Sequence, residues 1–293
     1  MQQLIVVLNI LAMVFTGWFI DWALQQDKTR KPLYFGLFIL VLIVMAALPF
    51  YGSPYSVIMV TSILMYLVLT VSWNMFSGPT GLASLATAAF FGVGIYTSAY
   101  LGKELPILLV VIIGGLFSFG LALIVGALTL RLKGVYFTIF TFGLVQLISA
   151  VLLWYEVKFA GTRGKFVVVV DNEMIFFIML SIFILLLIAS YLIRRSKYGL
   201  ALQSIGQYEE AASHIGVNVT AVKIVIFAIS AIFMGMAGAI MATRWTYVDP
   251  YSAFDSFISF LPVLMAIFGG MKKFYGPVVG AVIFAYLEEL LLT

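Results

Sequence analysis

The side chains that usually carry catalysis or bind metals are scarce in this sequence. Its 293 residues include 12 acidic residues, 16 lysines and arginines, a single histidine (His214) and no cysteine. Thiol chemistry, disulfides and Cys-ligated metals are therefore excluded, and a His-rich metal site is impossible. His214 stands in the sequence Ala-Ala-Ser-His-Ile-Gly between apolar stretches, which is typical of a solvated loop. We expect no catalytic residue, no metal site and no bound cofactor in this chain.

The polar groups inside the long apolar stretches are uncharged. Ionisable residues are absent from the centres of these stretches, which argues against proton-coupled transport and voltage sensing. A sodium-coupled carrier remains open, because such a carrier can bind its ion with backbone carbonyls and hydroxyls. Each central polar group can simply hydrogen-bond to a neighbouring helix, and together they would line a weakly polar path. These groups are Ser72, Asn74, Thr138, Thr141, Gln146, Ser149 and Ser230.

The elements that must position these groups are apolar helices. Hydrophobic residues make up 64% of the chain and charged residues only 10%. A soluble domain carries about 25% charged residues, so the composition excludes a soluble enzyme, a nucleic-acid-binding protein and a disordered chain. A membrane-spanning helix needs about 20 mostly apolar residues. The candidate spans are 3–24, 33–50, 56–76, 85–101, 106–130, 134–155, 174–193, 220–242, 257–270 and 275–292.

We therefore predict an all-α polytopic membrane protein with about ten transmembrane or partly re-entrant helices. The segments 85–101 and 257–270 are short, and either could be re-entrant. No Ser- or Pro-rich linker divides residues 1–293, so we expect a single transmembrane domain. With ten spans, eleven of the sixteen basic residues fall in one set of loops. The positive-inside rule places that set in the cytoplasm and both termini outside.

Small residues recur at helical spacing in several of the predicted spans. Ala231, Gly235 and Ala239 lie four residues apart, as do Gly94 and Ser98. In lipid, helices associate through close backbone packing, which small residues permit. We expect these positions to pack against neighbouring helices, although the glycines of 220–242 could instead mark a ligand path.

The longest polar segment, residues 194–219, lies on the predicted cytoplasmic side. Glu209 and Glu210 favour a helix start, because acidic side chains stabilise the positive end of the helix dipole. Gly216 can end that helix in a left-handed turn. The segment then forms a short amphipathic helix, which either rests on the lipid headgroups or docks into a cytoplasmic partner. Its apolar stripe would consist of Ile205, Ala212 and Ile215.

The same segment resembles the "EAA" signature of ATP-binding-cassette (ABC) importer permeases. The signature reads Glu210-Ala211-Ala212-x-x-x-Gly216, and the run Arg195-Ser196-Lys197-Tyr198-Gly199 before it is similar to permeases of the branched-chain amino-acid type. Further motifs in register cover residues 55–292. They include Asn74-x-x-x-Gly78, Ser84-Leu85, Arg131-Leu132-Lys133-Gly134, Phe268-Gly269-Gly270 and Gly276-Pro277.

The resemblance implies a multi-pass, non-catalytic permease subunit in the inner or plasma membrane of a prokaryotic cell. A second homologous permease subunit would complete the translocation path, and two cytoplasmic ATPases would grip the 203–217 helices. The coupling residues would be Glu209, Glu210, Ala211, Ala212 and Gly216. A binding protein outside the membrane would deliver the solute. The chain has no Gly-x-x-x-x-Gly-Lys-[Ser/Thr] phosphate loop, so we expect ATP and Mg²⁺ on the partner ATPases.

The substrate implied by the resemblance is a branched-chain or other small amino acid. Urea or short amides are the alternative, since relatives of this family serve them. A stand-alone secondary carrier or channel belongs to a different class and would need no ATPase. A membrane-embedded enzyme would need clustered reactive side chains, which this sequence does not offer.

Two short segments of the chain also look alike. Residues 84–92 and 259–269 both begin with serine and end with Phe-Gly. Internal repeats with interrupted helices mark transport sites in many carriers. If these segments form such a repeat, both flank the path, with Pro262 near it. The predicted path residues are then Asn74, Ser84, Thr87, Thr138, Thr141, Gln146 and Ser259.

Overall fold

The computed structural model describes residues 2–25, 31–132, 134–273 and 275–292, and these residues are almost entirely helical. Two short strands, β1 (Lys165–Phe166) and β2 (Tyr247–Val248), form an antiparallel pair. The helices are α1 (Gln2–Gln25), α2 (Lys31–Ala46), α3 (Leu48–Tyr51), α4 (Pro54–Thr80), α5 (Thr87–Leu101), α6 (Ile107–Thr129), α7 (Val135–Tyr155), α8 (Asn172–Arg195), α9 (Lys197–Gln207), α10 (Glu209–His214), α11 (Val219–Met241), α12 (Pro250–Ala253), α13 (Ser256–Gly269) and α14 (Tyr275–Leu292).

Within the described residues, six helical segments are long and apolar enough to cross a membrane. They are Pro54–Thr80, Ile107–Thr129, Val135–Phe159, Asn172–Arg195, Val219–Arg244 and Pro250–Gly269. Shorter apolar helices cover Ile5–Ile20 and Tyr275–Glu288. Each of the ten spans expected from the sequence contains a helix, so the all-α, multi-span fold is confirmed.

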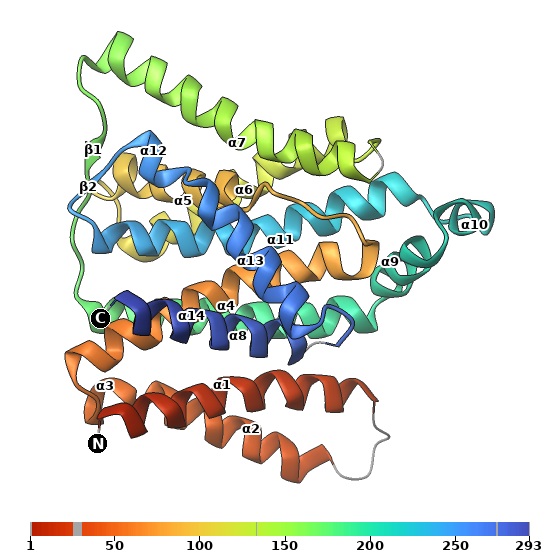
Figure 1. Cartoon of the computed structure of the whole chain (residues 1–293), viewed down its shortest axis with the longest axis horizontal. Coiled ribbons are helices and arrows are strands. Elements are labelled where there is room, and N and C mark those ends of the chain that lie inside the picture. The colour runs from red at the N-terminus through yellow and green to blue at the C-terminus, as the bar shows by residue number, and fades with distance from the viewer. Residues whose placement is uncertain (1, 26–30, 133, 274, 293) are drawn as a thin grey trace.

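The helices run between two distinct ends of the molecule (Figure 1). α9 and α10 lie at one end, which we call the coupling end. The β1–β2 pair and α12 lie at the other, the terminal end, where α1 also begins and α14 finishes (Figure 1). α6 and α13 also end at the coupling end, and α7 and α14 begin there (Figure 1), as the charge pattern predicts. Lys28, Arg30 and Lys133, which belong to the same basic set, lie outside the described residues.

α11 is the central helix of the bundle, and it packs most extensively against α6 and α5. The contact is between backbones: a methyl group added at Gly94 would overlap the Gly235 carbonyl and approach Ala239. A methyl group at Gly235 would in turn meet Ser118 and the Gly114 carbonyl of α6. The predicted packing role of the small residues in these helices is confirmed.

The span expected at 85–101 is helical only from Thr87 onward. α4 has Pro79 in its last turn and ends at Gly81, whose φ of +70° turns the chain back. Residues 81–86 are not helical, and they return from the coupling end toward the start of α5 (Figure 1). α5 is therefore a 15-residue helix that begins inside the bundle. We call residues 81–86 the extended segment.

Candidate functional site

The polar segment at the coupling end forms two helices rather than one helix over 203–217. α9 starts at the cap residue Ser196, whose hydroxyl accepts a hydrogen bond from Gly199 N. The chain becomes extended at Tyr208, with φ −157° and ψ 102°, and α10 begins at Glu209. The single-helix prediction is wrong at this point. Gly206 allows α9 to approach the end of α4 closely, because a Cβ at this position would overlap the Pro79 carbonyl.

Both ends of α10 follow the predicted pattern. Glu209 and Glu210 occupy its first turn. Gly216 has a φ of +89°, and the backbone around it forms a Schellman motif. In this motif Val217 N donates to the Ala212 carbonyl at 3.1 Å, and Gly216 N donates to the Ser213 carbonyl at 3.0 Å. The left-handed turn expected at Gly216 is therefore present.

One face of α9 and α10 is buried against the bundle, and the other face is exposed. Ile205 and Ala212 are buried against the bundle, in agreement with the predicted apolar stripe. Ile215 departs from that stripe, because 76% of its surface is exposed. Glu210, Ala211 and Gly216 are exposed as well. The exposed surface of α10 thus combines an acidic side chain with an apolar one, which suits contact with another protein.

Lys223 connects α10 to the central helix. Its side chain is only 4% exposed, and its ammonium group lies 2.7 Å from Oε2 of Glu209. A charge this buried is normally paired, so Glu209 serves as its counterion. Lys223 follows Asn218, which caps α11 by accepting a hydrogen bond from Ala221 N. The sequence did not identify Lys223 as a functional residue.

Four predicted path residues lie around the extended segment. Thr138 Oγ1 donates to the Ala83 carbonyl at 2.7 Å. Thr141 Oγ1 accepts from Leu85 N at 3.0 Å. Ser259 Oγ accepts from Ala88 N at 3.1 Å, at the start of α5. Ser84 takes part through its carbonyl, which accepts from Trp73 Nε1 at 2.7 Å.

These bonds replace the helical partners that the extended segment lacks. Backbone amides at membrane depth must be satisfied within the protein, since lipid offers no hydrogen bonds. α7 and α13 supply hydroxyl groups, and α4 supplies an indole N–H. The sequence predicted Thr138, Thr141 and Ser259 along one path. In the structure Thr138 and Thr141 bond to this segment, and Ser259 bonds to Ala88 just after it.

Two further predicted path residues are buried with polar atoms that have no hydrogen-bond partner. These atoms are Asn74 Oδ1 and Thr87 Oγ1. Thr87 and Ser84 line a small cavity of about 10 Å³ together with Ser77 and Ser230, a volume that fits about one water molecule. Gln146 lies apart on the exposed side of α7, and its Nε2 donates to Ser256 Oγ at 2.8 Å.

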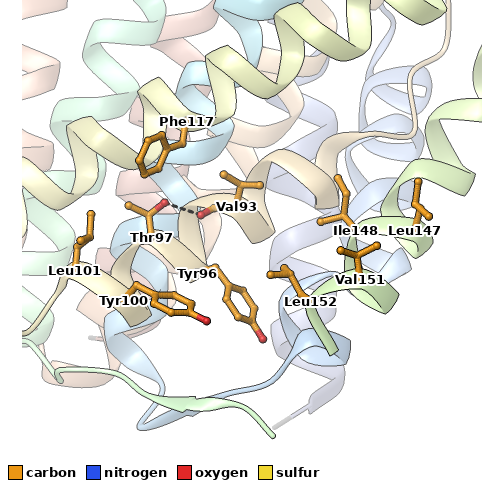
Figure 2. A pocket seen from close by; sticks show the side chains of 10 residues that line it. All are labelled: Val93, Tyr96, Thr97, Tyr100, Leu101, Phe117, Leu147, Ile148, Val151 and Leu152. Atoms are coloured by element: carbon orange, nitrogen blue, oxygen red, sulfur yellow. Dashed lines mark hydrogen bonds between the residues drawn. The ribbon is translucent and has the colours of Figure 1, made fainter. Parts of the chain in front are cut away.

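A much larger cleft lies between α5, α6 and α7, toward the terminal end. Its volume is about 590 Å³, within the range of small-molecule sites. The lining is apolar except for Tyr96, Thr97 and Tyr100. The hydroxyl groups of Tyr96 and Tyr100 point toward one end of the cleft, near the extended chain around β1 (Figure 2).

The terminal end carries a cluster of ionic contacts around the β1–β2 pair. Arg163 forms an ion pair with Asp249 at 2.8 Å and lies 4.7 Å from the centroid of the Tyr251 ring. Burial opposes the ionisation of Asp249, but hydrogen bonds from Ser252 and the charge of Arg163 outweigh it and lower the pKa of the carboxyl group. These contacts hold the loop 161–166 against the start of α12.

Glu156 is the other acidic residue near this cluster, and the sequence reading did not single it out. It begins a π-helical turn (Glu156–Ala160) directly after α7. Its residue exposure is 0%, and its Oε2 accepts a hydrogen bond from Gly164 N at 2.8 Å. From the sequence, a lone acidic residue beside a predicted span is expected to be solvated. Its burial is apparent only in the folded structure. Among the described residues, no cluster of three or more His, Asp or Glu side chains could hold a metal ion.

Comparison with known proteins gives a consistent set of matches. The family described as "Branched-chain amino acid transport system / permease component" matches residues 55–293. The high-affinity branched-chain amino acid transport system permease protein LivM of Salmonella typhimurium is 27% identical over 290 residues, covering 87% of this chain and 68% of the relative. LivM of Escherichia coli K12 is 26% identical over the same shares. The xylose transport system permease protein XylH of Haemophilus influenzae is 27% identical over 123 residues, 41% of this chain and 33% of the relative. No solved structure matches the chain significantly.

Proposed function

Since the chain belongs to the family of permease components of branched-chain amino acid transport systems, we propose that it forms the translocation path of an ATP-driven importer for branched-chain or other small amino acids. The observation that carries this proposal is the family match over residues 55–293. That range contains the extended segment, the cleft and α10. The protein acts as a non-catalytic, multi-pass membrane subunit.

The membrane orientation in this proposal follows from the two ends of the molecule. All ten apolar helices cross or enter the bilayer, with the coupling end in the cytoplasm and the terminal end outside. The excess of basic residues at the coupling end supports this direction. It also puts the exposed surface of α10 where a cytoplasmic protein can reach it.

The partners in the proposal follow from the same geometry. Two ATPase subunits, which hold ATP and Mg²⁺, dock on α9 and α10 of this chain and of a second, homologous permease subunit. A substrate-binding protein delivers the solute at the terminal end. Glu209, Glu210, Ala211, Ala212 and Gly216 transmit ATPase movement, and the ion pair from Glu209 carries it to α11.

The translocation path in the proposal runs beside the extended segment. Thr138 and Thr141 bond to that segment, Ser84 belongs to it and Thr87 follows it. Ser259 bonds to Ala88 at the start of α5, and Asn74 and Gln146 complete the proposed path from α4 and α7. Hydrogen bonds from α4 and α7 hold the extended segment in place, and Ser259 of α13 holds the start of α5. Movement of α11 against α5 would loosen these contacts and open a route toward the coupling end.

The experiment that tests this function is uptake by the reconstituted complex. The chain is co-expressed with its partner permease and ATPases, placed in liposomes, and supplied with the binding protein and labelled leucine. We expect leucine uptake into vesicles in which the coupling end faces the interior, and we expect this uptake to require ATP inside the vesicles. Uptake driven by an ion gradient without ATP would indicate a secondary carrier. Uptake of labelled urea, but not leucine, would assign the alternative substrate.

A further inference from the structure

One helical turn beyond Leu152, which lines the cleft in Figure 2, lies the buried carboxylate of Glu156, for which the described residues contain no ion pair. Glu156 Oε2 is held by Gly164 N at 2.8 Å, while its Oε1 is buried without a hydrogen-bond partner. The Tyr96 hydroxyl is also buried and unpartnered. It lies close enough to Glu156 for the two groups to interact electrostatically. A buried carboxylate is strongly unfavourable unless it is paired, so this arrangement is suited to an incoming cation.

The nearby positive side chains do not fill that role. Arg163 is engaged with Asp249 at 2.8 Å. Lys165 lies over the Tyr100 ring, with its ammonium group 3.6 Å from the ring centroid. Within the described residues, neither cation forms an ion pair with Glu156. The described ion pairs therefore leave Glu156 without a cation partner, and Lys165 stands beside Tyr100, which lines the cleft.

The cleft beside this carboxylate is apolar. Leu147, Ile148, Val151 and Leu152 of α7 face Val93 and Tyr96 of α5 across it (Figure 2). Its volume of about 590 Å³ falls within the usual range for sites that enclose small molecules. The site thus offers an anionic group at one end and an aliphatic wall along its length.

We propose that Glu156 binds the α-ammonium group of an amino acid whose aliphatic side chain occupies this cleft. The Tyr96 hydroxyl oxygen accepts a hydrogen bond from the same ammonium group, and Lys165 receives the α-carboxylate after leaving the Tyr100 ring. The inference rests on the proposed function, and it assigns the amino-acid class to a particular site at the terminal end. A lipid chain would match the aliphatic wall, but the phosphate of a headgroup would meet the Glu156 carboxylate.

Uptake by the reconstituted complex tests the charge of Glu156. Glu156→Gln keeps an oxygen that accepts the hydrogen bond from Gly164 and removes only the negative charge. Hydrogen bonds to charged groups are stronger than those between neutral groups, so we expect leucine uptake to fall about tenfold or more. The matched control is Glu104→Gln, an exposed carboxylate at the same end, which should leave uptake unchanged. Both variants should keep the thermal unfolding midpoint and the ATP hydrolysis that the binding protein stimulates.

Competition measurements separate head-group recognition from simple filling of the cleft. Labelled leucine is bound to the complex in nanodiscs without the binding protein. Isoamylamine, which keeps the ammonium group, should compete with leucine, whereas isocaproate, which keeps only the carboxylate, should compete weakly. Glu156→Gln should abolish this preference for the amine.

The inference is overturned if Glu156→Gln imports leucine at the wild-type rate, or if the two analogues compete equally. It is also overturned if native mass spectrometry finds a phospholipid in the cleft that leucine does not displace. Failure of the wild-type complex to import any amino acid would instead refute the proposed function. Wild-type import together with an unaffected Glu156→Gln variant would refute only this site.

Discussion

Lys223 of α11 and Glu209 of α10 form an ion pair of 2.7 Å in which the lysine is almost fully buried and the glutamate is 42% exposed. The pair joins the surface helix at the coupling end to the helix at the centre of the bundle. α11 in turn contacts α5 through the backbones of Gly94 and Gly235. The ion pair and this backbone contact therefore link α10 to the middle of α5 through α11.

Glu209→Gln should weaken both stability and coupling. The variant leaves the Lys223 ammonium buried without a counterion. Because the glutamate is partly exposed, we expect a loss of about 1–2 kcal/mol, between the values for exposed and buried pairs. Thermal unfolding in detergent measures the first effect, and the ratio of leucine imported to ATP hydrolysed measures the second. Glu210→Gln is the control for stability, since Glu210 has no ion pair in the described part of the chain; an equal loss there would contradict the role of Lys223.

Gly216 should tolerate asparagine but not valine. Its φ of +89° lies in the left-handed region, which asparagine adopts more readily than β-branched residues do. A Cβ at this position meets no atom within 4 Å, so the effect comes from the backbone alone. Gly216→Val should distort the end of α10 and reduce ATP-driven uptake while membrane insertion is unchanged. Equal uptake by Gly216→Val and Gly216→Asn would show that the turn is not required.

The backbone contact between α5 and α11 predicts a strong asymmetry between two glycines. Gly94→Ala places a methyl group against the Gly235 carbonyl, whereas Gly120→Ala on α6 meets nothing within 4 Å. Overpacking of this kind typically costs about 1–3 kcal/mol. We expect Gly94→Ala to lower the thermal unfolding midpoint and Gly120→Ala to leave it unchanged or raise it. The same midpoint for both variants would argue against a close α5–α11 contact.

Thr141→Val should destabilise the extended segment, and Thr141→Ser should not. Valine has nearly the shape of threonine but cannot accept the hydrogen bond from Leu85 N. An unsatisfied buried amide costs about 1–3 kcal/mol. Hydrogen exchange at residues 81–86, followed by mass spectrometry, should show faster exchange in Thr141→Val only. Unchanged exchange in that variant would mean that the bond does not hold the segment.

The sequence was sufficient for features that depend on local chemistry. The apolar helices follow from the length of the apolar runs, and the turn at Gly216 follows from the conformational freedom of glycine. No Gly or Pro stands at Tyr208 itself, and Gly206 two residues earlier does not by itself predict a break. The break depends on how α9 packs against the end of α4, where Gly206 meets the Pro79 carbonyl.

Features that depend on distant parts of the chain could not be predicted in the same way. The pairing of Lys223 with Glu209 requires α10 to fold back on α11. The partners of the extended segment, Thr138 and Thr141, lie more than fifty residues away along the chain. Glu156 looks solvated in the sequence because its burial arises only when Gly164 and Tyr96 close over it.

The ion pair between Arg163 and Asp249 predicts a defined pH dependence. The pKa of Asp249 is lowered in the fold, so the stability that its carboxylate contributes is present above its unfolded pKa of about 3.9. This stability is lost as the pH falls through the lower, folded pKa. Asp249→Asn should therefore reduce the unfolding free energy by up to about 1 kcal/mol at pH 7, since Arg163 is half exposed. The difference between wild type and variant should shrink only under strongly acidic conditions, when thermal unfolding is measured across a pH series. A difference that disappears between neutral pH and pH of about 5 would show that the folded pKa is not lowered, because a carboxyl group with a pKa of about 3.9 or less stays ionised over that range.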